Sequence, residues 1–380
     1  LFYGQRKVKI MSHLDQRWFI STPIKDGEVF SSWIIRSALD MGCSPLILVE
    51  ALWGKWRGLT VDLDRGIDGE RLDALLQHCF ESKRNIQQAM LSNIFPQLHQ
   101  RFDANHNIPW ILTLGIRNRS NLSGRQVCSA CLNEMGASPY LRLNWRMAWH
   151  CGCQKHHLCL IDRCPECGVA IQPFKIDLEH GSLAVCASCH YDLREAQVGK
   201  VNPSALNFQK IADHVLESGI GVYNQSLVSS QEWFAIARAW LSEIRILMMT
   251  QNQNLIQMFK SLDVDLGILL PLTPLSFEYL NTQERMGLLS ILNQVMSIPN
   301  DKLVQAAYQY GISSANFWDK RKQLPIQLQQ IKDAMIQPVR SSVPIRVSPS
   351  LNHPRSKASV QRMWLKLMRK ANKTGVKYFD

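Results

Sequence analysis

Four pairs of possible metal ligands, each with a gap of two residues, constrain the fold of this chain more than any other feature of its sequence. The pairs are Cys128–Cys131, Cys153–His156, Cys164–Cys167 and Cys186–Cys189. A two-residue gap lets a tight turn present both side chains to one tetrahedral ion. Disulfides explain the pattern poorly, because the number of cysteines, 11, is odd and the first residues contain no apolar stretch typical of a secretory signal.

The order of the pairs predicts two structural zinc ions. The last two pairs are 18 residues apart, within the range of a zinc ribbon, and the first two are 21 apart, slightly beyond it. We expect one site formed by Cys128, Cys131, Cys153 and His156, and a second formed by Cys164, Cys167, Cys186 and Cys189. Four ligands close each site, so neither keeps the open position that a catalytic zinc ion needs. Substitutes for a ligand of the first site lie nearby in the sequence, namely Cys151, His157 and Cys159.

Residues 28–53 have the pattern of two helices joined by a short turn. Apolar side chains recur at helical spacing from Phe30 to Met41, Gly42 permits a turn, and Ser44–Pro45 is typical of a helix start. Such a pair can form a DNA-binding helix-turn-helix, and two helices that only pack together explain the pattern equally well.

The C-terminal half has the periodicity of a helical domain. Ser229 and Glu232 have the spacing of a capping box and precede a helix with a wide apolar face. The stretch 302–323 has the spacing of a second helix-turn-helix, with Gly311 in the turn. Its second helix would expose side chains that can reach DNA, namely Asn316, Lys320, Arg321 and Lys322.

Positive charge is concentrated at the C-terminus. Residues 338–380 contain ten Lys or Arg and one acid, a net charge of +9 out of +12 for the chain. After a linker with four prolines, residues 358–373 form an expected amphipathic helix with a basic rim of Arg362, Lys366, Arg369, Lys370 and Lys373. Such a helix can bind nucleic acid, a groove on a partner or an anionic bilayer, and we expect it to pack on its own domain with the rim facing nucleic acid.

These features together predict a mainly α-helical protein with small β zinc ribbons. The expected layout is an N-terminal helix-turn-helix domain (1–125), a tandem zinc module (126–198), a C-terminal helical domain (199–337), and the linker with its basic helix (338–380). No apolar run reaches the ~18–20 residues of a membrane span, so we expect no membrane partner and a cytoplasmic, nucleoid-associated location.

Catalytic motifs are missing from the sequence. It contains no Gly-rich phosphate loop, Gly-x-Ser-x-Gly or His-Glu-x-x-His, so we expect no enzyme activity. Asp62, Asp64 and Asp68 are interpreted as the solvated charges of a loop. Residue 1 is Leu, and Met11 is a possible native start.

The residues around the zinc pairs have the order found in a known family. Cys128-x-x-Cys131 is followed by Tyr140, Trp145, Cys153-x-x-His156 and then Arg163-Cys164-Pro165-x-Cys167-Gly168. This run resembles the TniQ family, and the stretch 23–38, with Asp26-Gly27-Glu28, Ser32-Trp33 and Arg36, resembles that family's N-terminal motif. Together the two segments span about half of the chain. The chain departs from the family pattern at Cys151 and His157, beside the second ligand pair, and at Phe30, where Leu is commoner in the family.

The resemblance implies a role in transposition. TniQ proteins, including the longer TnsD-type members, are target-selection factors of Tn7-like transposons and are not transposases. Some read an attachment site on DNA, and others form a head-to-tail homodimer on a Cascade complex, whose guide RNA selects the target DNA. Either type recruits the AAA+ ATPase TnsC. The length favours the Cascade-bound type, towards which we lean, whereas the +9 tail favours direct DNA contact by a TnsD-like reader. A zinc-ribbon transcription regulator is a further alternative.

Overall fold

The computed structural model describes residues 17–56, 58, 61–99, 108–114, 124–267, 275–318, 323–337, 360–361 and 364. The chain divides into two compact units, Leu1–Ile336 and Gln337–Asp380. In the second unit, Val360, Gln361 and Trp364 are helical and exposed. The basic rim predicted there, Arg362, Lys366, Arg369, Lys370 and Lys373, lies outside the described residues.

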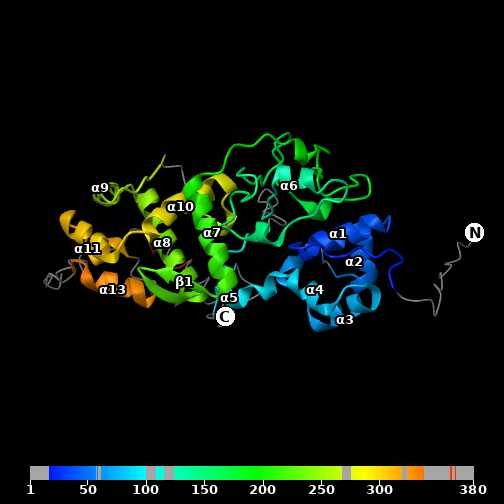
Figure 1. The fold of residues 1–380 in the computed structure, drawn as a ribbon, viewed down its shortest axis with the longest axis horizontal. Coiled ribbons are helices and arrows are strands. Elements are labelled where there is room, and N and C mark those ends of the chain that lie inside the picture. Colours follow the sequence, from blue (N-terminus) through cyan, green and yellow to red (C-terminus); the bar gives the residue numbers. More distant parts are fainter. Residues whose placement is uncertain are drawn as a thin grey trace, which may run out of the picture. The chain divides into compact units, whose positions relative to one another are not determined.

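The first unit is mainly helical, and its described residues include a two-stranded antiparallel sheet (Figure 1). The helices before the zinc segment are α1 (Phe30–Asp40), α2 (Pro45–Trp53), α3 (Gly69–His78), α4 (Lys83–Gln88) and α5 (Phe95–Leu98). Residues 126–198, here called the zinc segment, contain α6 (Ser129–Glu134). After it follow α7 (Pro203–Ser218), β1 (Ile220–Tyr223), β2 (Ser226–Ser229), α8 (Ser230–Thr250), α9 (Gln253–Ser261), α10 (Thr282–Met296), α11 (Asn300–Gln309), α12 (Ser314–Phe317) and α13 (Ile326–Ala334). Short 3-10 helices are Leu63–Arg65, Leu91–Asn93, Leu143–Arg146, Pro173–Lys175, Leu193–Glu195 and Phe277–Tyr279.

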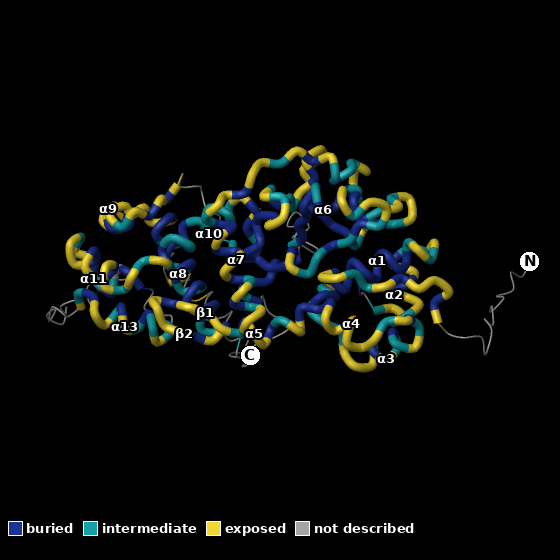
Figure 2. Tube along the Cα trace, in the orientation of Figure 1, coloured by how far each residue is buried: buried dark blue, intermediate teal, exposed yellow. Residues whose placement is uncertain are grey.

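Helices α1 and α2 form the helical pair predicted for residues 28–53. Figure 2 shows that α1 is buried along most of its length, and the Trp33 indole N–H donates to the Thr22 carbonyl at 2.8 Å. Helix α2 starts at Pro45, as predicted, and its large exposed apolar side chains are Leu46 and Ile47, each 61% exposed. The sequence of α2 contains no Lys or Arg. This helix therefore offers no cation to a phosphate, and its DNA-binding role stays a prediction.

The carboxylates of Asp62 and Asp64 are not solvated loop charges, contrary to our expectation. Asp64 is fully buried, accepts the Ser31 backbone N–H at 2.8 Å, and forms ion pairs with Arg125 and Arg146 at 2.6 and 2.5 Å. Asp62 pairs with the same Arg146 at 2.6 Å. Burial raises the pKa of Asp62, but the charge and hydrogen bonds of Arg146, together with the charges of Arg125 and Arg65, outweigh burial, so the pKa lies below its usual value. Local sequence patterns do not indicate this cluster, because the two arginines follow the acids by more than 60 residues.

Asp68 differs from the other two carboxylates, although it is not a simple solvated charge either. It is the N-cap of α3, and its side chain accepts the Arg71 backbone N–H at 2.9 Å. Half of the side chain is exposed. Its role is local helix capping.

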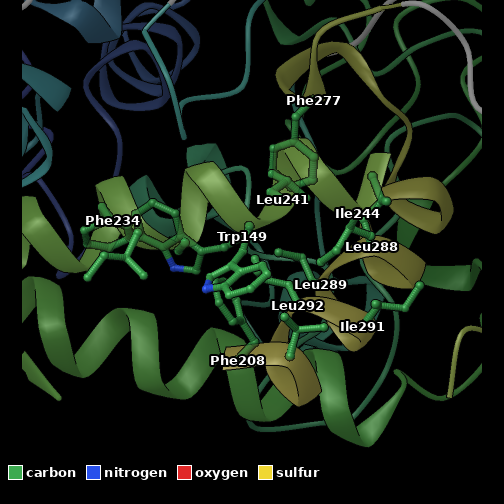
Figure 3. Close-up of a cluster of buried hydrophobic side chains, with 14 of the residues drawn as sticks. Trp149, Phe208, Phe234, Leu241, Ile244, Phe277, Leu288, Leu289, Ile291 and Leu292 are labelled. Carbon is green, nitrogen blue, oxygen red and sulfur yellow. The ribbon is translucent and has the colours of Figure 1, made fainter. Parts of the chain in front are cut away.

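The core of the C-terminal half is built on α8. The predicted capping box is present, since Ser229 Oγ accepts the Glu232 N–H at 3.3 Å and Glu232 Oε2 accepts the Ser229 N–H at 2.9 Å. The β1–β2 hairpin before it was not predicted, and α9 follows α8 closely along the chain. Trp149 of the zinc segment enters this core, with its ring 5.0 Å from that of Phe234 in α8 (Figure 3).

The stretch 302–323 matches the predicted helix-turn-helix only in its first part. Helix α11 is followed by Gly311, whose φ of 64° is the left-handed turn that we expected. The next helix, α12, has only four residues, and Phe317 and Trp318 at its end are buried against Trp240. Residues 319–322, including Lys320, Arg321 and Lys322, lie outside the described residues, as does the side chain of Asn316. A recognition helix at this place stays a prediction.

The β structure of the zinc segment is limited to isolated bridges in the part that the structure describes, among them Val127↔Ile161, Arg163↔Ala170 and Val185↔Asp192. The expected ribbons are thus turns closed by single bridges. Within the same described residues, no helix alone has the length and apolarity to cross a membrane. Helices α1 and α2 have this length and apolarity only when they are taken together, and a bend of 105° separates them.

Candidate metal centres

Three of the four ligand pairs lie in turns with the same backbone geometry. In each turn, the residue after the second ligand donates its N–H to the carbonyl of the first ligand and has a positive φ. The donors are His157, Gly168 and His190, which bond to Cys153, Cys164 and Cys186 at 2.8, 2.9 and 2.9 Å and have φ of 54°, 69° and 60°. Gly168 suits this turn, since glycine adopts a positive φ without steric strain. The two histidines adopt the same conformation at some energetic cost.

The first pair is presented by a helix. Cys128 is the N-cap residue of α6, and its carbonyl accepts the Leu132 N–H at 3.0 Å. Cys131 lies in the first turn of α6, so both sulfur atoms project from the start of the helix. Centre one therefore combines a helix start with a turn, whereas centre two combines two turns.

Centre one brings together the predicted residues Cys128, Cys131, Cys153 and His156. The Cys131 and Cys153 sulfur atoms are 3.5 Å apart, and His156 Nδ1 lies 3.3–3.5 Å from the three sulfur atoms. Zinc bond lengths of about 2.0–2.3 Å put tetrahedral ligands about 3.6–3.8 Å apart. The spacing of these atoms fits one tetrahedral ion, slightly contracted.

Centre two brings together Cys164, Cys167, Cys186 and Cys189. Two sulfur pairs, Cys164–Cys189 and Cys167–Cys186, are each 3.7 Å apart. This is the separation expected around a tetrahedral zinc ion, about 3.8 Å. Cysteine and histidine clusters of this kind suit zinc, and the two centres are consistent with it.

The two centres differ in exposure. All three cysteines of centre one are buried, whereas Cys167 and Cys189 of centre two are exposed. The Val169 backbone N–H lowers the pKa of Cys167 to about 7, so this thiol ionises readily to the form that binds metal. In centre one, hydrogen bonds from the Cys128 and Cys131 thiols hold the pKa of Cys153 well below its usual value.

A carboxylate outside the ligand set supports centre one. Glu134 Oε1 lies 3.1 Å from His156 Nε2, and Lys155 donates to the other carboxylate oxygen at 2.6 Å. A proton held on Nε2 leaves Nδ1 free for the ion, which is the usual arrangement of a metal-bound histidine. Glu134 was not predicted from the sequence, although its place three residues after Cys131 in a helical stretch indicates that it could reach this centre.

The substitute ligands considered for centre one lie elsewhere. His157 is exposed, Cys159 Sγ faces the Lys200 carbonyl at 3.3 Å, and Cys151 Sγ accepts from the Arg285 guanidinium at 3.6 Å. None of the three belongs to the ligand groups found among the described residues. The ligand set drawn from spacing is therefore the set that the structure brings together.

A third group of possible ligands, Glu179, His180 and His190, is less suited to a metal ion than the two centres. The Asp177 backbone N–H donates to His180 Nδ1 at 3.1 Å. A neutral imidazole that accepts at Nδ1 carries its proton on Nε2 and so has no lone pair left for an ion. Its ring instead stacks on that of His190, with centroids 4.5 Å apart.

The fold and the two centres define a mainly helical protein with two groups of four side chains, each of which could hold one metal ion. No curated protein matches the chain with significant similarity. Residues 19–160 match the family model TniQ, and this match supports membership of the TniQ family. The matched segment contains α1, α2 and every ligand of centre one. Membership implies a target-selection role associated with Tn7-like transposition, in a family of non-catalytic accessory proteins.

Proposed function

We propose that both centres hold zinc ions that stabilise the fold. The support is the donor chemistry, seven thiols and one imidazole, at the spacing of tetrahedral ligands. A zinc ion with four protein ligands has no site for a water nucleophile. The ions therefore have a structural role and stabilise the surfaces around them.

The protein itself acts as a non-catalytic adaptor for target-site selection in Tn7-like transposition. It links a target-recognition element, a Cascade-type RNA-guided complex or DNA directly, to a TnsC-type AAA+ ATPase. The observation that carries this proposal is the TniQ match over residues 19–160. Function then rests on binding energy, with partners brought together on surfaces that the two centres hold in place.

The exposed side of α2 favours a protein partner for the N-terminal helical pair. Leu46 and Ile47 are both 61% exposed, and the helix has no basic residue. Direct DNA readers present Lys, Arg or amide side chains in this position. We therefore favour the RNA-guided type, in which pairing with a guide RNA reads the sequence and the adaptor contacts proteins.

A recruitment assay tests the adaptor role. The purified full chain, a TnsC-type ATPase and target DNA are combined with and without a Cascade-type complex, and ATPase retained on the DNA is measured. We expect retention only when the adaptor and the guide complex are both present. The Leu46→Glu/Ile47→Glu variant should lower retention, while Leu178→Glu, at an exposed apolar residue of the zinc segment, should leave it unchanged. Equal retention with and without the adaptor would contradict the proposal.

Binding to DNA alone separates the alternatives. A TnsD-like reader would bind naked target DNA, with an affinity that falls steeply as the salt concentration rises, because phosphate contacts release counterions. A transcription regulator would bind promoter DNA without any transposon protein. The RNA-guided adaptor should bind naked DNA weakly and without sequence preference.

A further inference from the structure

The two backbone segments that carry the ligands of centre one meet at a buried polar network. Gln126, two residues before Cys128, donates to the carbonyls of Trp145 and His150 at 3.0 and 2.7 Å. Its side-chain oxygen accepts from the Arg285 guanidinium at 2.8 Å. Arg285 belongs to α10, so a helix far along the chain contacts the approach to the first ligand pair.

The same arginine holds the approach to the second ligand pair. Its Nη1 donates to the Ala148 and His150 carbonyls at 2.6 and 3.0 Å, and its Nε donates to the Leu280 carbonyl at 3.2 Å. Only 1% of Arg285 is exposed. A guanidinium presents its donors in one rigid plane, so it fixes the relative positions of the groups that it bonds. Here these groups lie on both ligand-bearing segments.

Helix α7 contacts the second segment from another side. Gln209 Oε1 accepts the N–H groups of Cys151 and Gly152 at 3.1 and 3.3 Å, and Gln209 Nε2 donates to the Gly152 carbonyl at 2.9 Å. Gln209 is 1% exposed. The last residue held by these bonds, Gly152, directly precedes the ligand Cys153. One turn later, Asp213 accepts from the Trp149 indole at 2.8 Å and from Gln154 at 2.6 Å.

We propose that centre one is positioned from outside the zinc segment, by Arg285 of α10 and Gln209 of α7, which hold the two segments that carry Cys128 and Cys153 in register. The ligand turns of centre two close on themselves, and α10 contacts the approach to them through a different residue, Thr282, whose N–H donates to Asp162 Oδ2 at 3.3 Å. The C-terminal helices and centre one therefore form one cooperative unit, and metal affinity at centre one depends on residues that touch neither the ion nor its ligands.

A positioning role predicts an effect on metal binding that ordinary destabilisation does not produce. Bonds that orient a metal ligand change metal affinity about 10–100-fold when they are removed. The effect should be confined to the centre whose segments Gln209 and Arg285 hold. Cobalt makes this visible, because Co²⁺ bound by three sulfurs and a nitrogen absorbs at different wavelengths from Co²⁺ bound by four sulfurs.

The experiment is a Co²⁺ titration of the full chain followed by visible absorption. Gln209→Leu removes the polar contacts while largely keeping the side-chain volume. Its matched control is Asn207→Leu on the same helix, where the side chain bonds to Asn293 of α10 and touches neither ligand segment. We expect Gln209→Leu to weaken Co²⁺ binding at centre one about 10–100-fold and to shift its absorption bands, with centre two unchanged. The control should leave both centres unchanged.

A second variant keeps the test decisive if Gln209→Leu fails to fold. Arg285→Lys preserves the charge but replaces five donors in one plane by three donors on a single nitrogen, which cannot reproduce all of these bonds, and it should weaken the same centre selectively. The inference is overturned if folded variants keep wild-type affinity at centre one, or if both centres weaken equally. The inference rests on the zinc assignment, so binding of fewer than two ions by the wild-type chain would refute that assignment and this inference with it.

Discussion

Replacing Arg146 by Met should strongly destabilise the protein. Arg146 is 1% exposed, and its guanidinium donates to Asp62 at 2.9 and 2.6 Å, to Asp64 at 2.5 Å and to the Leu112 carbonyl at 2.9 Å. Methionine fills much of the space but donates no hydrogen bond. The variant leaves two buried carboxylates with less compensation, which is the costly way to break a buried ion pair.

The expected loss in the free energy of unfolding depends on the ion-pair partners that the two carboxylates keep. Removing one partner of a buried ion pair costs about 3–5 kcal/mol. Arg125 still pairs with Asp64 at 2.6 Å and Arg65 with Asp62 at 3.3 Å, so the low end applies, about 3 kcal/mol. The Arg65→Met control removes a single, longer contact of the same carboxylate, at 3.3 Å, and it should cost less than Arg146→Met.

Urea denaturation at neutral pH, monitored by circular dichroism, measures both variants. The midpoint should fall much further for Arg146→Met than for Arg65→Met, with similar slopes. Because the pKa of Asp62 lies below its usual value, its stabilisation is complete above about pH 4 and is lost as pH falls through the lower folded pKa. This acid dependence should weaken in Arg146→Met. A loss below about 1 kcal/mol, with an unchanged acid profile, would show that the cluster contributes little.

Three further predictions test the centres and the packing around them. Cys164→Ser should reduce bound zinc from two ions to one and unfold the region of centre two, because structural zinc supplies on the order of 10 kcal/mol of folding free energy. Metal analysis and proteolysis measure this, and two retained ions would contradict it. Ser229→Ala should cost about 1 kcal/mol in thermal unfolding by removing the α8 capping box, and no change would mean that the cap is dispensable. Gly152→Ala should destabilise the chain and weaken centre one, because a Cβ there would lie 2.4 Å from Val201 Cγ2; wild-type metal affinity would speak against that crowding.

The features that could be predicted from sequence are those that depend on neighbouring residues. The ligand turns need only a two-residue gap and a residue that tolerates a positive φ, and both centres formed from the expected sets. The start of α8 was readable from Ser229 and Glu232 for the same reason. The β1–β2 hairpin was missed because its turn residues, Asn224 and Gln225, carry a weak signal despite positive φ values of 46° and 64°.

The polar networks could not be predicted, because their partners lie far apart in the sequence. Arg146 and Asp64 are separated by 82 residues, and Arg285 and Gln126 by 159. A single sequence shows Asp62 and Asp64 as acids in a polar stretch, which is the usual pattern of a solvated loop. Only the fold brings the arginines to them. The predicted DNA contacts at 316–322 and in the basic tail depend on residues outside the described parts of the chain and stay predictions.

The burial of Trp149 has a practical consequence for anyone who wishes to study fragments of this protein. Its indole, carried by the zinc segment, lies in the same core as the later helices, with its ring 5.0 Å from that of Phe234 in α8. A truncation at residue 198 would remove these helices and leave a large aromatic surface exposed to water. It would also remove Arg285, which bonds to Gln126. Such a piece should aggregate even in the presence of excess zinc, so expression trials should retain the chain through α13.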